Sequence, residues 1–591
     1  MSSNDVDPFL LEVLKNGLDT IADEMALVLM KTAYSGIVRD SMDFSTAVCD
    51  AEGQTLAQGL TTAMHLGSFY DAMRCLITTQ TGNIFPDDVF IFNDPYVAAG
   101  QHLPDIYIIK PIFYEERLVA WATTIAHHSD VGGIVPGSNA LGAVEIYQEG
   151  IRIPILKFMD RGKPVDPVWQ IVALNVRLPD LLMGDLQAQM AACTACERNM
   201  TDLFRRYGRE TMTAYFSHLH DYAERLARAE IRDIPDGTYE FTDHIDGLGK
   251  KPVPIVLKVK VIVAGDGVTI DWSGSSEQVK GGINSPLPFT KACAYTAMRS
   301  IMTADVPNCF GYTRAIKVVA PEGSVMNPTM PYPCGARGIT GYRMIDCQFG
   351  ALAQAVPGKV TADNMGGSTL PTIAGWVDGK PYVFCETFMG TWGAARAHDG
   401  QEGVPHMGAN QSNVPVEMIE TGYPLRIVRY GFVPDTGGAG KFRGGVSIVR
   451  EFEMLADDAV LNVRSDKRKF PPHGLFGGEP GTPSLNYLTH NGKDRLLPAL
   501  LMETEPMMRG DRFRAILAGG GGYGDPFERD PELVRADVSE EKITAEYARK
   551  HYGVVIRPRP RFAIDKAATK KLRDRPRKRK RPVAVARPRS E

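Results

Sequence analysis

Residues 101–130 read QHLPDIYIIKPIFYEERLVAWATTIAHHSD and contain two apolar runs, 105–114 and 117–126. Both runs are rich in β-branched and aromatic residues, which favour β-strands. Only Glu115 and Glu116 separate them, so we expect an antiparallel hairpin with a two-residue turn. The outer ends of the two strands should therefore lie side by side.

Histidines and aspartates gather at the open end of this predicted hairpin. The chain has 12 histidines, and pairing would bring His102 and Asp105 beside His127 and His128. Two histidines and a carboxylate suit Zn²⁺, Mn²⁺ or Fe²⁺ with positions left for water or substrate. Adjacent residues of a strand point to opposite faces, so only one of His127 and His128 would be a ligand. A polar hairpin end whose histidines are satisfied by hydrogen bonds explains the same residues.

The rest of the chain predicts a mixed α/β (α+β) fold with several domains, because 591 residues exceed what one core usually organises. Apolar residues at three- and four-residue spacing predict a long N-terminal helix over 8–33 and a central helical segment over 178–231. From about residue 236 strand patterns and turns dominate. The predicted division is an N-terminal α/β domain with the metal site and the helical segment (1–235), a central α+β domain (236–430), a Gly/Pro-rich β domain (431–548) and a basic tail (549–591).

The predicted tail differs from the rest of the chain in charge. From Arg557 to Glu591 there are 15 Lys and Arg residues against three Asp and Glu, although the net charge of the chain is −4. Few apolar residues accompany them, so we expect this segment to be disordered. Because the chain has no nucleic-acid motif, nucleic acid is not expected as a partner.

Targeting and redox features indicate a cytoplasmic protein. The N-terminus has no basic region before an apolar stretch, and no run of 18 apolar residues suggests a membrane span. The nine cysteines are scattered, which fits reduced thiols. Cys193 and Cys196 fall on one face of a predicted helix and are expected to pack in a core.

Two glycine-rich stretches raise the question of nucleotide binding. DTGGAGKFRGG (435–445) and AGGGGYGDP (518–526) both lack the spacing of a P-loop. We expect tight turns there, and no cofactor-binding residues for ATP on this chain. The GxSxG motif of a serine hydrolase is also absent.

Several stretches in order along the chain resemble the hydantoinase B/oxoprolinase family. They are RDSMDFSTAVCDAEGQTLAQG, MHLGSFYDAM, FNDPYVAAGQHLPDIYIIKPIF, AHHSDVGG, EIYQEGIRIPILK, PDLLMGDLQAQMAAC, NPTMPYP, GGAGKFRGG and GGGGYGDP. The resemblance runs from about residue 7 to about residue 555 and leaves out the basic end.

The resemblance implies a divalent metal, Zn or Mn, held by His102, Asp105 and His127. Asp43 is a further ligand candidate, because related subunits carry an aspartate there. His128 and Asp130 would then either support the ligands through hydrogen bonds or act catalytically as proton carriers.

The resemblance also implies a partner and a reaction. The partner is a hydantoinase A-type subunit that binds ATP with Mg, in a heterotetramer or larger assembly. The implied activity is ATP-dependent hydrolysis of a cyclic amide (a lactam, hydantoin or oxoproline type), in which metal-bound hydroxide attacks a substrate phosphorylated by the partner. The alternative is a subunit of an ATP-dependent ketone carboxylase acting on acetone or an aromatic ketone.

Overall fold

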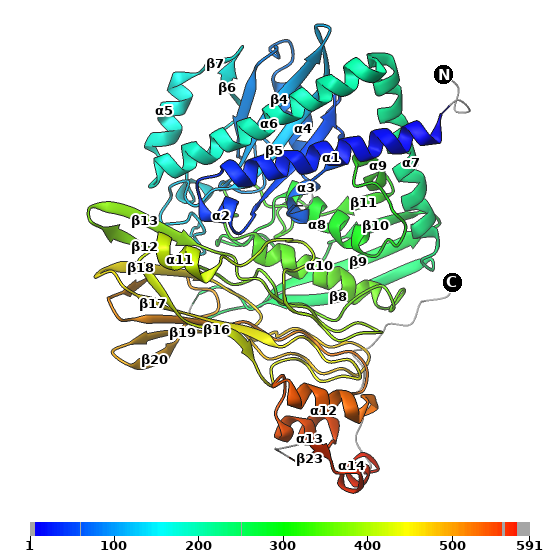
Figure 1. Ribbon diagram of the computed structural model, residues 1–591, viewed down its shortest axis with the longest axis vertical. Coiled ribbons are helices and arrows are strands. Elements are labelled where there is room, and N and C mark those ends of the chain that lie inside the picture. Colours follow the sequence, from blue (N-terminus) through cyan, green and yellow to red (C-terminus); the bar gives the residue numbers. More distant parts are fainter. Residues whose placement is uncertain (1–5, 60, 250, 558–561, 576–591) are drawn as a thin grey trace.

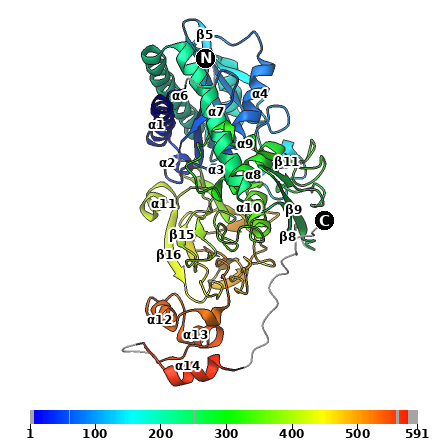
Figure 2. The same ribbon diagram turned by 90° about the vertical axis from the view of Figure 1, so that its right-hand side faces the viewer.

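The structure is a computed structural model that describes residues 6–59, 61–249, 251–557 and 562–575. It is elongated, with a helix-covered sheet at the top of Figure 1, a β-rich part below it and small helices at the lower end. Figure 2 shows the same order from the side, with α12, α13 and α14 farthest from the N-terminal part. The chain has the predicted mixed α/β architecture with several sheets. Among the described residues, no helix combines the length and apolar content needed to span a bilayer.

The predicted hairpin forms the centre of a seven-stranded sheet with strand order β2-β1-β5-β4-β3-β6-β7. Its strands are β1 (Phe44–Asp50), β2 (Thr55–Gln58), β3 (Val89–Phe92), β4 (Asp105–Tyr114), β5 (Arg117–His127), β6 (Leu156–Asp160) and β7 (Lys163–Pro164). In the antiparallel β4–β5 pair, Asp105 lies opposite His127. Glu115 and Glu116 both have positive φ, 50° and 61°, as a type I′ hairpin turn requires. The hairpin prediction is confirmed.

Helices cover both faces of this sheet, which explains why its central strands are apolar on both sides. Helices α1 (Pro8–Thr32) and α6 (Pro179–Tyr207) contact β1, β4 and β5 on one face. On the other face α4 (Phe69–Thr79) packs in a second apolar cluster with Tyr107 and Trp121. Cys193 and Cys196 of α6 are fully buried in the first cluster, as predicted for core residues.

A second layer follows helix α7 (Arg209–Arg232). Its four-stranded sheet has the order β11-β10-β9-β8. These strands are β8 (Gly237–Ile245), β9 (Ile255–Ala264), β10 (Gly267–Asp271) and β11 (Ile316–Val319). Helix α10 (Gly338–Leu352) lies between β8, β9 and helix α8 (Leu287–Ser300), and each of its 15 residues is buried. One continuous apolar cluster includes residues from this layer and from the N-terminal layer.

The β-rich part has its own apolar cluster and two larger sheets. One sheet contains β13 (Lys380–Cys385), β12 (Leu370–Val377), β18 (Ala459–Arg464) and β21 (Glu505–Met507) in that order. The other contains β16 (Leu425–Val433), β17 (Ser447–Met454), β22 (Arg512–Ile516), β19 (Leu485–His490) and β20 (Lys493–Leu496). Shorter elements complete the chain: α2 (Gly36–Arg39), α3 (Ala63–Leu66), α5 (Asp166–Leu174), α9 (Phe310–Thr313), α11 (Val416–Gly422), β14 (Gly390–Thr391) and β15 (Glu402–Val404).

The glycine-rich stretches, for which we expected tight turns, pack backbone against backbone. Three segments, 437–445, 474–481 and 519–524, lie so close that a Cβ would overlap a neighbouring carbonyl oxygen at many positions. A Cβ added to Gly444 would lie 2.0 Å from the oxygen of Gly520, one added to Gly481 1.9 Å from that of Gly519, and one added to Gly478 2.1 Å from that of Gly522. Only glycine permits this approach, so these stretches build a layer made of backbone.

The C-terminal region corrects the prediction of a disordered tail from residue 549. That boundary falls inside helix α13 (Ala545–Tyr552), and β23 (Ile556–Arg557), β24 (Ala563–Ile564) and α14 (Lys566–Arg573) follow. Tyr552, Val554 and Ile556 are buried in an apolar cluster with α12 (Pro531–Ser539), and this burial organises a segment whose charge alone suggested disorder. Residues 576–591, which hold much of the basic run, lie outside the described residues. The other predicted domain boundaries stay predictions.

Candidate metal centre

His102, Asp105 and His127 meet at the open end of the β4–β5 hairpin. One ligand atom from each lies within 4.8 Å of the others, and all three side chains are buried. Asp105 is the first residue of β4 and His127 the last of β5, and the register places them opposite each other. His102 lies in the loop before β4, where its backbone oxygen accepts a hydrogen bond from the Asp105 N–H at 3.1 Å.

Within the described part of the chain, several polar atoms of this triad have no hydrogen-bond partner. His102 Nε2 and Asp105 Oδ1 are 3.0 Å apart, but neither forms a hydrogen bond, and neither do the two ring nitrogens of His127. A buried polar atom without a partner costs about 1–3 kcal/mol. Converging nitrogen and oxygen lone pairs without hydrogen bonds are the arrangement that a bound divalent cation needs, so the residues present fit a metal.

The protonation states suit metal ligands. Burial, followed by the charge of Arg337, lowers the pKa of His102 to about 4. Burial, followed by His102, lowers the pKa of His127 well below its usual value. Burial would raise the pKa of Asp105, but Arg337 and the neighbouring histidines outweigh it and hold that pKa well below its usual value. The site therefore offers neutral imidazoles and an ionised carboxylate, the forms that bind metals.

Outer contacts orient two of the three side chains. His102 Nδ1 lies 2.9 Å from the backbone oxygen of Gly335, and donation there leaves the Nε2 lone pair facing Asp105. Arg337 donates to Asp105 Oδ2, and at 2.8 Å to Gln101 Oε1. The Arg337 guanidinium also lies 4.3 Å from the centre of the Phe289 ring. Arg337 thus occupies one carboxylate oxygen and leaves the other free for a cation.

The spacing argument missed His65, which lies in α3 beside this triad. Its Nε2 is 3.7 Å from Asp43 Oδ1 and 3.8 Å from Asp105 Oδ2, and its Nδ1 is 3.3 Å from Ser45 Oγ. Burial is the main cause that lowers its pKa, to about 4. The stretch MHLGSFYDAM contains this histidine, but its one acidic residue, Asp71, pairs with Lys291 away from the triad, so spacing gave no signal for His65.

Asp43 lies next to the triad but not within it. Its backbone oxygen accepts from the N–H of His127 at 2.9 Å, which fixes β1 against the end of β5. Its carboxylate faces His65 and is not among the atoms that lie within 4.8 Å of one another. Burial, followed by the charge of Asp105, raises the pKa of Asp43 to about 7. Its role as a further ligand stays a prediction.

His128 and Asp130 point to other partners. His128 Nε2 lies 3.3 Å from Gln189 Oε1, and its Nδ1 lies 3.9 Å from Asp185 Oδ2, both on α6. Asp130 pairs with Arg177 at 2.8 Å and accepts from three backbone N–H groups, those of Gly132, Gly137 and Arg177. As expected for neighbours on a strand, His127 and His128 face opposite ways. The proposed proton-carrying roles of His128 and Asp130 stay predictions.

The sequence model of the hydantoinase B/oxoprolinase family matches residues 7–526, which covers most of the chain and the whole site described above. The chain belongs to the hydantoinase B/oxoprolinase family. The family resemblance is therefore confirmed, whereas the assignment of the metal ligands stays a prediction.

Two relatives, each about a third identical to this chain, support this membership. The candidate B-type component of a D-/L-hydantoinase from Pseudomonas sp. strain NS671 is 34% identical over 569 residues and covers 93% of this chain and 95% of its own length. The beta component of the caprolactamase from Pseudomonas jessenii is 33% identical over 582 residues, 96% of this chain and 99% of its own length. The crystal structure of that ATP-dependent caprolactamase has a TM-score of 0.89 at 31% identity, covering 96% of this chain and 100% of that chain. A nucleotide-free structure of acetone carboxylase shares the fold, with a TM-score of 0.90 at 19% identity, covering 96% of this chain and 83% of that chain.

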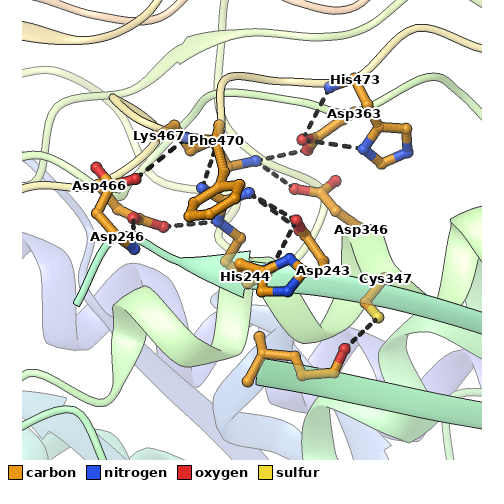
Figure 3. Close-up of polar contacts among 12 residues, drawn as sticks. Asp243, His244, Asp246, Asp346, Cys347, Asp363, Asp466, Lys467, Phe470 and His473 are labelled. Carbon is orange, nitrogen blue, oxygen red and sulfur yellow. Dashed lines mark hydrogen bonds and ion pairs between the residues drawn. The ribbon is translucent and has the colours of Figure 1, made fainter. Parts of the chain in front are cut away.

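A second buried polar cluster of this hydantoinase B-type chain lies around Lys467, just beyond the end of β18. Lys467 Nζ is 2.7 Å from Asp346 Oδ2 and 2.5 Å from Asp363 Oδ1, and it also donates to the backbone oxygen of Asn364. Figure 3 shows Lys467, Asp346 and Asp363 facing one another, with His473 on the far side of Asp363. We call the charged groups of this cluster the Lys467 network: Asp243, Arg343, Asp346, Asp363, Asp466 and Lys467.

The Lys467 network ties helix α10 to the end of β18. Arg343 of α10 contacts Asp466 at 2.6 Å and Asp243 of β8 at 3.0 Å. Each positive charge therefore meets at least two negative ones within the described residues. The network fixes how the N-terminus of α10, which carries Arg337, lies relative to the metal centre.

Proposed function

We propose that this chain is the metal-bearing subunit of an ATP-dependent hydrolase of cyclic amides. The observation that carries the proposal is the triad of His102, Asp105 and His127, whose buried ligand atoms converge without hydrogen-bond partners. The relatives support the reaction class, since they are named as components of a hydantoinase and a caprolactamase and share about a third of their residues with this chain.

An unstrained amide reacts slowly with water, and two kinds of activation can act in this site. A divalent cation bound by the triad would lower the pKa of water towards neutrality and polarise a substrate oxygen. The chain's own residues prepare the site for it. Gly335 orients the imidazole of His102, and Arg337 keeps Asp105 ionised. His65 and Asp43, 3.7 Å apart, form a pair beside the triad that can hold or pass a proton.

The second activation, phosphorylation of the amide oxygen, is assigned to a partner. The sequence has no P-loop, and the names of the relatives mark them as one component of a larger enzyme, a B-type component in one case and a beta component in the other. We therefore propose an ATP-binding A-type partner, joined with this chain in a heterotetramer or larger assembly. Light scattering of the co-expressed chains would test the stoichiometry.

A cavity of about 260 Å³ provides a candidate entrance for a small cyclic substrate. It is lined by Tyr34, Tyr382, Cys385 and Tyr423 and by the ion pair of Arg39 and Asp40, which suits a small ring that carries polar groups. Cys385, at the end of β13, is part of this lining.

The test combines metal analysis with a substrate panel. The chain purified with its partner should contain a divalent metal, with Zn and Mn the expected ions, and should open a lactam, a hydantoin or 5-oxoproline only when ATP is present. Loss of metal by chelation should stop ring opening and re-addition should restore it. A complex that contains no metal and still opens the ring would contradict the proposal.

The fold shared with acetone carboxylase favours a second candidate, a subunit of an ATP-dependent ketone carboxylase. At 19% identity this likeness carries the fold alone, so the hydrolase is preferred. Incubation with ATP, labelled bicarbonate and acetone or acetophenone decides between them: fixed label supports the carboxylase, and amide opening without fixed label supports the hydrolase.

A further inference from the structure

Arg464, the last residue of β18, is a buried cation with no partner among the described residues. Its side chain donates no hydrogen bond and lies within 4.0 Å of no carboxylate there, and the residue is 5% exposed. Its Nε is among the buried atoms that lack a partner. An unpaired buried charge is costly, so such a group is retained where a ligand supplies the missing negative charge.

The other deeply buried arginines show how unusual this is. Arg343, Arg443, Arg450 and Arg529 each form an ion pair with at least one carboxylate. Arg337 is paired with Asp105. Arg464 differs from all five because, in the part of the chain that the structure describes, it faces no acidic group at contact distance.

Arg464 is directed at the N-terminus of helix α10. A Cβ built on Gly338, the first residue of that helix, would lie 2.9 Å from Arg464 Nη1. No side chain caps this end, because the N-cap residue Arg337 turns its guanidinium to Asp105. The N-terminus of a helix carries partial positive charge, so two positive groups face each other here, and no described carboxylate pairs with Arg464 between them.

This pair lies beside the metal centre. Arg337, directly before Gly338, is bonded to Asp105 of the triad. The positive charge of Arg464 also acts on His127 and on Asp43. The Lys467 network holds Arg464 and helix α10 together. Asp466 and Lys467 follow Arg464 by two and three residues, and they contact Arg343 and Asp346 of α10. Figure 3 labels Asp466, Lys467 and Asp346 among the polar contacts of this network.

We propose that Arg464 and the N-terminus of α10 at Gly338 form an oxyanion subsite that holds a phosphoryl group next to the metal centre. Guanidinium groups and helix N-termini are the two protein groups best suited to phosphate oxygens. The subsite rests on the proposed function in one respect, namely that the phosphoryl group arrives on the activated amide. Free inorganic phosphate has the same chemistry and is the other source of such an anion.

The binding test uses the full chain and inorganic phosphate. Titration calorimetry on the wild type should detect phosphate, and Arg464→Met should weaken it at least tenfold, whereas Arg464→Lys should retain part of the affinity. Gly338→Ala is the second variant, because its methyl group would push the guanidinium aside while alanine suits a helix. Arg495→Met is the control, since Arg495 is exposed on β20 and pairs with Glu505. No phosphate binding to the wild type, or equal binding to Arg464→Met, would overturn the subsite.

The coupling test separates the two sources and separates the subsite from the proposed function. In the complex with ATP and a lactam, the wild type should consume a constant amount of ATP per ring opened. If the subsite holds the phosphoryl group of the substrate, Arg464→Met should raise ATP use per ring opened severalfold. If it holds only released phosphate, the ratio stays constant and product inhibition by phosphate weakens instead. If phosphate binding depends on Arg464 but no ring is opened, the proposed function is wrong and the subsite stands. If rings are opened but phosphate binding does not depend on Arg464, the subsite is wrong and the proposed function stands.

Discussion

The metal centre and the Lys467 network are both buried clusters of acidic and basic side chains. They differ in whether the polar atoms of these side chains have partners. In the network each cation lies between carboxylates at 2.5–3.0 Å. In the centre, His102 Nε2, Asp105 Oδ1 and both nitrogens of His127 have no partner within the described residues. Burial and charge are common to structural and functional clusters, so the unsatisfied atoms distinguish a binding site from a structural clamp.

Substitution of His102 by alanine should produce the largest effect on function. Coupled ring opening should fall about a thousandfold or more, because a metal lowers the barrier by several kcal/mol and each 1.36 kcal/mol is about a factor of ten. Elemental analysis should find the metal lost. The free energy of unfolding of the metal-free protein should fall by about 1–3 kcal/mol, because the substitution leaves the Gly335 backbone oxygen without the His102 imidazole as its partner.

His398→Ala is the matched control, because His398 is exposed and its side chain bonds only to the backbone oxygen of Asp399 within the described residues. It should keep both metal and activity. Retention of metal and full activity by the His102 variant would remove the centre from the mechanism.

Lys467→Met should lower the stability of the fold and leave metal binding intact. It leaves Asp346 and Asp363 buried without their shared cation, which should cost about 3–5 kcal/mol of unfolding free energy. The variant that still folds should bind metal like the wild type. Urea denaturation followed by metal analysis measures both, with exposed Lys493→Met as the control, expected within about 0.5 kcal/mol of wild type. Loss of metal with unchanged stability would show that the network belongs to the centre.

Asp130→Asn tests whether Asp130 is a proton carrier or an anchor for its turn. Its contacts with Arg177 and three backbone N–H groups favour the anchor, so we expect a loss of about 1–3 kcal/mol in stability with activity reduced less than tenfold. A general acid or base would instead give a loss of about 10²–10⁴ in rate and normal stability. Thermal unfolding and steady-state kinetics on the same preparation decide.

His473→Gln should give the smallest change, visible only as a pH dependence. Burial lowers the pKa of His473, but the hydrogen bond and charge of Asp363, 3.3 Å away, outweigh it and raise that pKa. Protonated His473 therefore stabilises the fold fully below the unfolded value of about 6.5, and this stabilisation is lost as the pH rises through the raised folded value.

Urea denaturation between pH 6 and 9 measures that difference. The wild type should lose its advantage over His473→Gln as the pH increases, because the pKa of His473 is raised in the folded state. If the difference in unfolding free energy between the two proteins stays constant across this range, the contact between His473 and Asp363 does not contribute to the pH dependence of stability.

The sequence predicted the hairpin because two uniform apolar runs and a two-residue turn leave one register. That register alone brought His127 opposite Asp105. His65 and Arg337 could not be found this way, because they reach the site from α3 and from the start of α10 through tertiary packing. Arg464 could not be predicted either, because its neighbours in sequence do not indicate which groups face it in the fold. The folded part beyond residue 549 was missed because three buried apolar residues outweigh a basic composition.

The backbone layer built by the segments 437–445, 474–481 and 519–524 has a consequence for folding order. Its glycines offer no side chains for hydrophobic collapse, which is left to Ala439, Phe442, Leu475 and Tyr523, and glycine loses more conformational entropy on folding than any other residue. Its hydrogen bonds, such as that from the Gly438 N–H to the oxygen of Gly520 at 2.8 Å, join residues far apart in sequence. Contacts of that kind form late. The layer should therefore be completed only after the apolar cores on either side are in place, and it should tolerate replacement of its glycines worse than the cores tolerate exchange of one aliphatic residue for another.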